Sequence, residues 1–290
     1  MFGKQIDNFI ALSKNLTIAV VGETITDEFI FVTYEGPSMK SLCPALKLTG
    51  RKETHQGGAA AIANHLRDFV KLVDVISNPP DEIIKTRYVD ANDGKKHVEI
   101  NSFNLKKDKT VSVNTADYDV VIVADFGHGF SNNFSINDGF HLMCQTNSNN
   151  FGFNRISKWK KHQKKSVCID LREASLQLNK KAGFDTDNDI DDLYNYELNA
   201  ENLFITTGST GALHYNGQTV NRQPAFKSII ADTIGAGDTF FGFVSLATAI
   251  LPPQEMLIVP SLAASLSTTW LGNAKSVTKD MLKEYATKFI

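Results

Sequence analysis

The sequence is poor in cysteine and in excess charge of either sign. Its three cysteines, Cys43, Cys144 and Cys168, are odd in number and lie outside any Cys-x-x-Cys spacing, so we expect reduced thiols and no zinc site. The formal net charge of −2 at pH 7 gives no general attraction to nucleic acid or to an anionic membrane. Any anionic ligand must therefore be held by a local site.

Long apolar runs and export signals are also missing. No uncharged apolar run approaches the ~18 residues of a membrane-spanning helix, and residues 1–15 lack a basic start followed by an apolar core. We therefore expect a cytoplasmic protein without nucleic-acid or membrane partners. Gly22 is followed by Glu-Thr-Ile-Thr, and no Gly-x-x-x-x-Gly-Lys-Ser/Thr occurs. These two absences argue against a Rossmann oxidoreductase and a P-loop enzyme.

Five short apolar runs indicate the framework of the fold. They begin at Thr17, Val120, Leu142, Val167 and Leu203, alternate with helical segments, and end in polar or glycine residues. Such runs are typical of strands buried on both faces of a parallel sheet, and ligands gather at the carboxyl ends of these strands. No repeat or linker divides the chain, so we expect one α/β domain over residues 1–290.

Additional β-prone pieces over residues 29–55 and 85–115 predict a small β lid beside this sheet. The second segment alternates around Asp93-Gly94, which is a strong hairpin signal. Between the two segments, Gly57 and Gly58 precede a helical pattern that runs to Val73 on one face. Two glycines before a helix permit close approach to a ligand.

Residues 231–239 set two glycines and an aspartate in front of a long apolar run, Phe240 to Leu251. A helix that starts after Gly237 would direct free N–H groups and the positive end of its dipole at the turn, where an anion can bind. Asp238 could then take the proton of a hydroxyl that attacks a phosphoryl group. The alternative is a tight turn with an aspartate cap and no ligand.

The sequence Asp-Thr-Ile-Gly-Ala-Gly-Asp at residues 232–238 resembles the signature of ribokinase-like (PfkB) carbohydrate kinases at every fixed position. Asp-Phe-Gly-His-Gly at residues 125–129 is similar to a turn in the bacterial heptose-phosphate kinases of this family. The resemblance extends from Gly22 to Asn273. It implies a ribokinase-like α/β fold, with an open, mostly parallel sheet flanked by helices and a small β lid. It also implies an ATP-dependent kinase acting on a hydroxyl of a sugar or sugar phosphate.

The same resemblance assigns candidate residues to each part of the site. The catalytic set is Asp238 as base, with backbone N–H groups of Ile234 to Gly237 around the phosphoryl group, so that Gly235, Ala236 and Gly237 belong to it. Candidates for acceptor binding are Asp27, Gly57, Gly58, Asn64, Asp125, Gln145 and Asn147. Candidates for nucleotide binding are Thr206, Thr207, Gly208, Gly211, Asp232 and Thr233. Glu173 and Asp170 resemble the family's Asn-x-x-Glu magnesium element, although Asp stands where Asn is usual.

The interpretation of several residues and segments stays open. Ala61 occupies a position where many family members have asparagine, and His128 is either a substrate contact or an idle loop histidine. The basic run from Lys158 to Lys165 is interpreted as a solvated helix face. In the family, the region near Gly272-Asn273 lies by the adenine and sometimes a monovalent cation, and the lid in many members pairs subunits into a homodimer.

Two alternatives concern the function itself. A nucleoside kinase would share the fold and the signature, and a non-catalytic sugar-binding protein would keep only the fold. Among kinases, we favour an already phosphorylated acceptor, because residues 125–129 resemble a turn of kinases that act on heptose phosphates. The lid segments also carry donors for a second phosphate. These donors are Lys40, Lys47, Arg51, Lys85 and Arg87.

Overall fold

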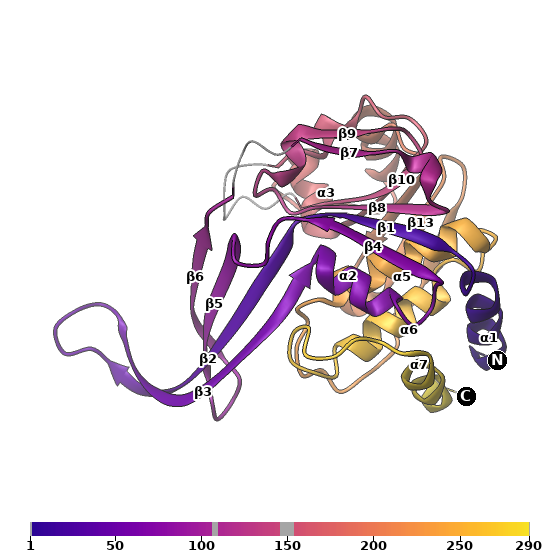
Figure 1. Cartoon of the computed structure of the whole chain (residues 1–290). Helices are drawn as coiled ribbons and strands as arrows, with labels where there is room; N and C mark the ends of the chain where they lie inside the picture. The colour runs from indigo at the N-terminus through magenta and orange to yellow at the C-terminus, as the bar shows by residue number, and fades with distance from the viewer. Residues whose placement is uncertain (1, 106–109, 146–153, 290) are drawn as a thin grey trace.

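The computed structural model describes residues 2–105, 110–145 and 154–289. Its main sheet has eight strands in the order β14-β13-β12-β11-β10-β8-β1-β4 (Figure 1). The six strands from β12 to β4 are parallel, and β13 and β14 extend the sheet as an antiparallel hairpin. The strands are β1 (Thr17–Gly22), β4 (Leu72–Ser77), β8 (Val120–Asp125), β10 (Phe140–Cys144), β11 (Lys165–Asp170), β12 (Asn202–Thr206), β13 (Ala212–Tyr215) and β14 (Val220–Gln223).

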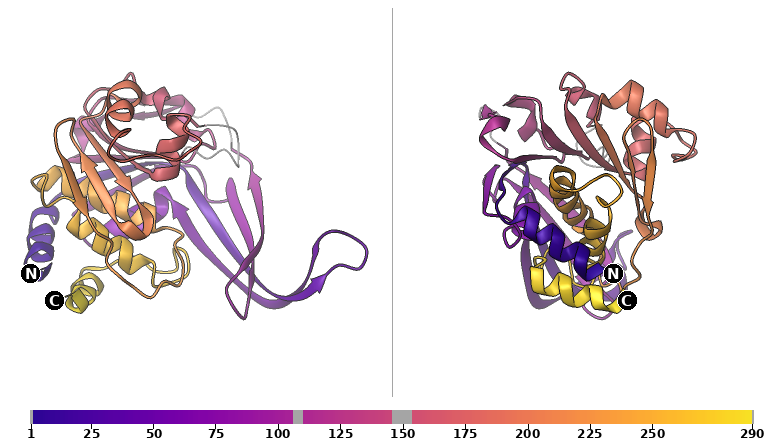
Figure 2. Two further views of the ribbon diagram at one scale, coloured as in Figure 1. Left: turned by 180° about the vertical axis from the view of Figure 1, so that it is seen from behind. Right: turned by 90° about the vertical axis from the view of Figure 1, so that its right-hand side faces the viewer.

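Alternate side chains of the central strands enter two separate hydrophobic layers. Ile122 belongs to a layer that contains most of the long helices, whereas Val121 and Val123 face shorter elements on the other side (Figures 1 and 2). Both faces are therefore buried, as expected for a parallel sheet. The first layer contains α1 (Phe2–Ser13), α2 (Ala59–Leu66), α5 (Ala236–Ile250), α6 (Ile258–Ser267) and α7 (Lys279–Ala286).

The opposite face is covered by short helical segments and a two-stranded sheet, β7 (Val111–Val113) with β9 (Phe134–Ile136). Residues 111–113 were expected in the lid, and this pairing places them elsewhere. Within the described ranges, no helix has the length and apolar character needed to cross a bilayer. The remaining helical segments are α3 (Leu171–Gln177), α4 (Ile190–Asp192), the π-helix η4 (Leu193–Leu198), and the 3₁₀ turns η1 (Thr115–Asp117), η2 (Phe130–Asn133), η3 (Ile156–Trp159), η5 (Gly208–Thr210) and η6 (Thr287–Phe289).

A four-stranded sheet, here called the outer sheet, stands beside the main sheet (Figure 1). Its order is β3-β2-β5-β6, with β2 (Thr24–Pro37), β3 (Pro44–Gly58), β5 (Ile83–Asp90) and β6 (Lys96–Phe103). The hairpin expected around Asp93-Gly94 joins β5 to β6 and is confirmed. β2 and β3 are much longer than the β-prone pieces suggested, because their pairing continues through Gly57 and Gly58.

The apolar run after residue 239 forms α5, as predicted, and nine of its fifteen residues are buried. The helix begins at Ala236, two residues before the expected start, so Asp238 lies within its first turn. Gly235 caps the helix with φ = 82°, a left-handed conformation that favours glycine. The three candidates Gly235, Ala236 and Gly237 thus form the entry to this largely buried helix.

Two expectations about local structure were wrong. Val73 was assigned to the face of a helix, but α2 ends at Leu66 and Val73 lies in β4, which pairs with β1. The basic run was interpreted as a solvated helix face, but Lys165 lies in β11 with only 1% exposure. The Lys165 ammonium group donates to the carbonyls of His162 and Asn199, and burial lowers its pKa to about 8.

Candidate active site

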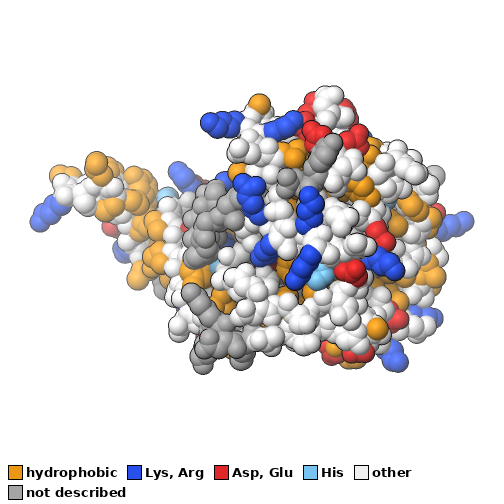
Figure 3. Space-filling view, turned by 90° about the horizontal axis from the view of Figure 1, so that it is seen from above, with side chains coloured by type: hydrophobic (Ala, Val, Ile, Leu, Met, Phe, Trp, Pro, Cys, Tyr) orange, Lys and Arg blue, Asp and Glu red, His pale blue; other side chains and the backbone are white. Residues whose placement is uncertain are grey.

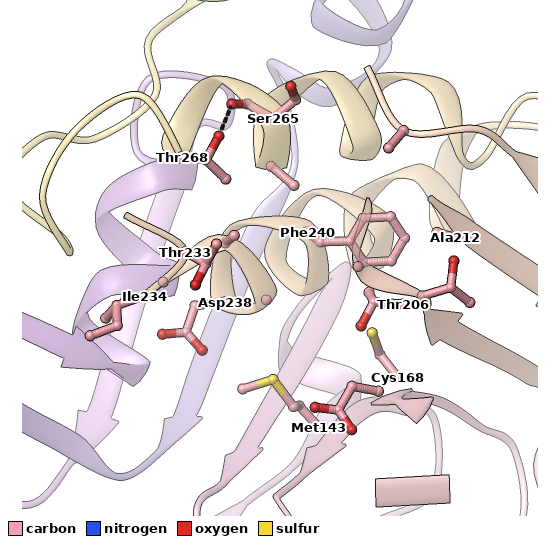
Figure 4. A pocket seen from close by; sticks show the side chains of 18 of the residues that line it. Met143, Cys168, Thr206, Ala212, Thr233, Ile234, Asp238, Phe240, Ser265 and Thr268 are labelled. Carbon is pink, nitrogen blue, oxygen red and sulfur yellow. Dashed lines mark hydrogen bonds between the residues drawn. The ribbon is translucent and has the colours of Figure 1, made fainter. Parts of the chain in front are cut away.

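A cleft of about 1120 Å³ lies where the parallel strands end. Figure 4 shows strand-end side chains such as Thr206 on one side of it, α6 on another, and Asp238 between them. Position at the carboxyl ends of parallel strands is usual for ligand sites in open α/β sheets. The lining includes Asp27, Gly58, Lys85, Arg87, Gln145, Asp170, Glu173, Thr206, Thr207, Gly208, Gly211, Thr233, Gly235, Ala236, Gly237 and Asp238. Most of the predicted site residues therefore share one cleft.

Asp238 occupies the first turn of α5 and lines the cleft. Burial raises the pKa of this carboxyl to about 7, and the negative charge of Asp27 adds to the increase. The backbone N–H of Gly58 and the charge of Lys85 act in the opposite direction. A carboxyl with a pKa near neutrality is well matched to accepting a proton at physiological pH.

The turn before α5 is held by Asp232. Its Oδ1 accepts the N–H groups of Thr233 at 2.8 Å and Ile234 at 3.2 Å, and its Oδ2 accepts the N–H of Gly272 at 3.1 Å. Of the four N–H groups expected to surround a phosphoryl group, that of Ile234 is thus occupied, and Ala236 donates to the Thr233 carbonyl at 3.3 Å. The N–H groups of Gly235 and Gly237 have no acceptor among the residues described.

Asp232 itself does not line the cleft, so it shapes the turn rather than facing the nucleotide. Its neighbour Thr233 does line the cleft, and Figure 4 shows the Thr233 side chain beside that of Ile234 at the start of α5. The anion-binding capacity of this turn consequently rests on Gly235, Gly237 and the helix dipole.

Gly58 brings the end of β3 against Glu23. A Cβ at Gly58 would lie 2.2 Å from the Glu23 carbonyl oxygen, so only glycine fits there. The Glu23 carboxylate is fully buried and accepts from Phe130 N–H at 3.0 Å and His128 Nδ1 at 2.9 Å. The sequence reasoning did not identify this supporting role of Glu23, although the residue directly follows Gly22 at the end of β1.

Asp27, on β2, is positioned by an ion pair with Arg87 on β5. Arg87 also donates through Nε to Glu99 at 2.9 Å. The other carboxylate oxygen of Asp27, Oδ2, faces Gly57, where an added Cβ would approach it to 2.6 Å. Gly57 is therefore required by close packing, and Asp27 keeps an oxygen with which to accept a hydroxyl group.

Lys85 lines the cleft from β5 and is 8% exposed. Burial lowers the pKa of its ammonium group, while the negative charges of Glu99, Asp27 and Asp238 partly restore it. No ion pair within 4.0 Å engages Lys85 in the described part of the chain. A buried cation in this position is a strong candidate for an anionic ligand.

A second wall of the cleft is the loop after β12. Thr207 N–H donates to the Gly211 carbonyl at 2.8 Å, and this bond closes a tight turn around η5. Gly211 adopts φ = 120°, and a Cβ there would lie 2.0 Å from the Gln223 carbonyl oxygen. The loop places Thr206, Thr207 and Gly208 at the cleft, where Thr206 and Thr207 are half-buried and Gly208 is exposed.

Asp170 and Glu173 form a capping box at the start of α3. Asp170 accepts from Glu173 N–H at 2.7 Å, and Glu173 accepts from Asp170 N–H at 2.8 Å. Burial raises the pKa of Glu173 to about 8, and the neighbouring charge of Asp170 adds to this. No group of three or more metal-ligating side chains gathers in the described residues. Two carboxylates at a cleft nevertheless suit Mg²⁺, which keeps several waters and takes phosphate oxygens.

Three candidates for acceptor binding do not line the cleft, namely Gly57, Asn64 and Asp125. Asp125 is fully buried, and its carboxylate bonds to Trp159 Nε1 at 2.8 Å and Ser131 Oγ at 2.9 Å, with Lys158 Nζ at 2.6 Å. Burial alone would raise the pKa of Asp125, but Lys158 holds it below its usual value. Asn64 instead accepts a hydrogen bond from Arg67 on α2. We therefore withdraw Asp125 and Asn64 from the acceptor site and retain neither as a contact.

The other loop candidates differ in whether they line the cleft. His128 is buried, bonds to Glu23 and does not line the cleft, so it supports the fold rather than the substrate. Gln145 does line the cleft, and its Oε1 is buried without a hydrogen-bond partner among the described residues. Asn147 lies outside the described residues.

Comparison with known proteins agrees with this arrangement. Residues 144–280 match the sequence profile of the pfkB family carbohydrate kinases. The 2-dehydro-3-deoxygalactonokinase of Haloferax volcanii is 36% identical over 85 residues, which are 29% of this chain and 27% of that protein. The chain thus aligns with only about a quarter of the length of the curated relatives it matches.

Solved structures share the fold of almost the whole chain. The ribokinase of Thermotoga maritima superposes with a TM-score of 0.69 at 17% identity, covering 94% of this chain and 99% of that one. The ribokinase of Arabidopsis thaliana, complexed with ribose and ATP, gives a TM-score of 0.65 at 14% identity, covering 94% and 99%. The chain therefore has the ribokinase fold.

The segment that matches the family profile, residues 144–280, includes only part of the cleft lining. Thr206, Glu173 and Asp238 fall within residues 144–280, whereas Asp27 and Lys85 precede them. The sequence relationship therefore bears on the nucleotide side and on the base, and the acceptor side has to be argued from its own chemistry.

Proposed function

We propose that this protein is an ATP-dependent kinase that transfers the γ-phosphoryl group to a hydroxyl of a sugar or sugar phosphate. The observation that carries the proposal is the position of Asp238, in the first turn of α5, inside the cleft, with a pKa raised to about 7. Its carboxylate would accept the proton of the attacking hydroxyl. Residues 1–290 would act as one domain, with the outer sheet over the acceptor.

The backbone around Asp238 would stabilise the transferred group. The free N–H groups of Gly235 and Gly237, together with the dipole of α5, can receive the negative charge that develops on the phosphoryl oxygens. Asp27, held by Arg87, would orient the acceptor by taking a hydrogen bond from a second hydroxyl. The attacking oxygen would therefore be fixed between Asp27 and Asp238.

The loop after β12 would bind the nucleotide. Its phosphates would meet the hydroxyl groups of Thr206 and Thr207 and the backbone N–H of Gly208, while Gly211 closes the turn. Asp170 and Glu173 would hold a hydrated Mg²⁺, which supplies charge neutralisation between the phosphate groups. A dependence on a monovalent cation stays a prediction from the family resemblance.

The raised pKa of Asp238 predicts how activity changes with pH. The base must be ionised, so kcat/KM should increase about tenfold per pH unit below pH 7 and become constant above it. Because the charge of Lys85 lowers the pKa of Asp238, Lys85→Met should shift this profile toward higher pH. Steady-state rates between pH 5 and 9 test both points, and a flat profile through pH 7 would contradict the assignment of the base.

The acceptor is proposed to carry an anionic group, a phosphate in our preferred form. Of the five outer-sheet cations that could bind this anionic group, only Lys85 and Arg87 line the cleft. Arg87 already forms ion pairs with Asp27 and Glu99. Of these two cations, Lys85 is the one without an ion pair in the described residues. A phosphate at this position would supply the charge partner that the buried ammonium group lacks.

The outer sheet is proposed to close over the acceptor as a lid. Residues 85–103 include both Lys85 and the hairpin between β5 and β6. Their backbone amides should therefore exchange with deuterium more slowly when the acceptor and a non-hydrolysable ATP analogue are both bound. Unchanged exchange at demonstrated saturation by both ligands would argue against closure.

The outer sheet is also proposed to join two copies of the chain. Met39, Leu42, Leu48 and Tyr34 are exposed on the arm formed by the far ends of β2 and β3 (Figure 3). Burial of such side chains against a second copy would stabilise a homodimer.

One experiment separates this function from its alternatives. ADP release should be measured over a panel of free sugars, sugar phosphates and nucleosides. Turnover of a sugar or sugar phosphate supports the proposal, and turnover of adenosine with none on sugars would assign a nucleoside kinase. Tight sugar binding without ADP release for any member of the panel would indicate a sugar-binding protein of the same fold.

A further inference from the structure

An ion pair joins the outer sheet to the turn before α5. Lys96, at the start of β6, places Nζ 2.9 Å from Oδ1 of Asp232, which lies 136 positions later in the chain. The Asp232 side chain is 6% exposed and that of Lys96 is 35% exposed. The contact is therefore partly shielded from water, which strengthens it relative to a surface pair.

Asp232, which pairs with Lys96, is also the residue that holds the turn before α5. Asp232 accepts the N–H groups of Thr233 and Ile234, immediately before the helix cap Gly235, and that of Gly272 on the following connection. Burial opposes ionisation of Asp232, and the bond from Lys96 offsets that cost and keeps its pKa below the usual value. The charge of Lys96 thus supports an ionised acceptor for three backbone N–H groups.

A hydrophobic contact reinforces the same junction. Phe29, Phe31 and Val89 of the outer sheet form a small buried cluster with Leu271 against it. Leu271 precedes Gly272, whose N–H is bound by Asp232. Three segments therefore meet at one place: the outer sheet, the connection after α6 and the turn before α5.

We propose that Lys96 is a positioning residue for phosphoryl transfer, and that it couples the placement of the outer sheet to the order of the turn at residues 232–235. The inference rests on the proposed function. With the outer sheet against the cleft, Lys96 holds Asp232 and the turn presents Gly235 and Gly237 to the phosphoryl group. With the outer sheet displaced, the ion pair is lost and the turn loosens, so that phosphoryl transfer is favoured only when the acceptor is covered.

The kinetic test compares Lys96→Met with Lys95→Met. Lys95 belongs to the same hairpin and is exposed, and no ion pair involves it within the described residues. Lys96→Met should lower kcat about five- to tenfold, with a smaller change in the KM for ATP, whereas Lys95→Met should match the wild type. Lys96→Arg, which keeps the charge, should recover most of the loss.

Asp232→Asn gives the double-mutant test of the pair. If Lys96 acts through Asp232, adding Lys96→Met to Asp232→Asn should cause little further loss of kcat. If the double variant loses kcat by the product of the two single losses, the proposal is overturned. Equal effects of Lys96→Met and Lys95→Met on kcat would also overturn it.

Amide hydrogen exchange, which needs no turnover, tests the coupling independently of the proposed function. Amides of residues 231–237 should exchange faster in ligand-free Lys96→Met than in the wild type and in Lys95→Met. If no acceptor is ever phosphorylated but this exchange increases, the proposed function fails and the coupling stands. Unchanged exchange in Lys96→Met would refute the coupling even in an active kinase.

Discussion

Asp238→Asn is expected to leave a folded protein whose turnover is lower by about 10²- to 10⁴-fold, the usual contribution of a positioned general base. The amide keeps the size of the carboxyl group but cannot accept the proton of the acceptor hydroxyl. Binding of ATP should change little, because Asp238 does not belong to the nucleotide loop. Single-turnover rates and ATP titration of the variant measure these two effects separately.

Stability should change in a direction fixed by the raised pKa of Asp238. The folded state retains this proton up to about pH 7, while the unfolded chain releases it near the usual value of 3.8. The stabilisation is therefore complete below pH 3.8 and is lost as the pH increases through 7. Asp238→Asn removes this loss, so the variant should be at least as stable as the wild type at pH 8 in denaturant unfolding.

Asp280→Asn provides the matched control. Asp280 also lies in the first turn of a helix, α7, but it is exposed and outside the cleft. Its replacement should leave both turnover and the pH profile unchanged. Near wild-type turnover by Asp238→Asn with any good acceptor would remove Asp238 from the mechanism.

A phosphorylated acceptor is expected to exceed the matching free sugar by ~10²-fold or more in kcat/KM, the scale of two charge-assisted hydrogen bonds. Lys85 is the cation placed to make them. Lys85→Met should lower kcat/KM for the phosphorylated acceptor by about tenfold or more, and should affect the free sugar far less. The comparison is made at pH 8, where Asp238 is ionised in both proteins.

Lys47→Met tests whether any outer-sheet lysine would have this effect. Lys47 lies on β3, is exposed and does not line the cleft, so its replacement should leave the preference intact. Equal efficiency of the wild type toward the phosphorylated and free acceptors would rule out the anionic subsite.

The main sheet and the helix after the signature were predictable because their causes are local. A strand buried on both faces, such as Val120–Asp125, needs a continuous apolar run. Gly235 marks the entry to α5 for the same kind of local reason, namely a left-handed φ of 82° that favours glycine. The edge strand β4 was missed because Asp74 and its partly exposed neighbours lack such a run.

The acceptor side of the cleft was predicted less well, since its residues take their roles from distant partners. Asp125 ends a strand just as a ligand-binding aspartate would, but Trp159 and Lys158 occupy its carboxylate. Lys85 and Arg87 were equivalent in sequence, and only the ion pairs of Arg87 with Asp27 and Glu99 distinguish them. Which cation of a lid meets the substrate is a property of three-dimensional charge pairing.

The order of the outer sheet has a consequence for how copies of the chain can associate. β3 and β6 are its edges, so their outward backbone groups could template further strands and promote aggregation. β3 opposes this with Pro44 at its start, the charged residues Lys47, Arg51 and Lys52 along it, and two irregularities in its pairing with β2. Growth of the sheet by addition at the β3 edge is thereby disfavoured, so the homodimer proposed above would have to form through the exposed side chains of the arm.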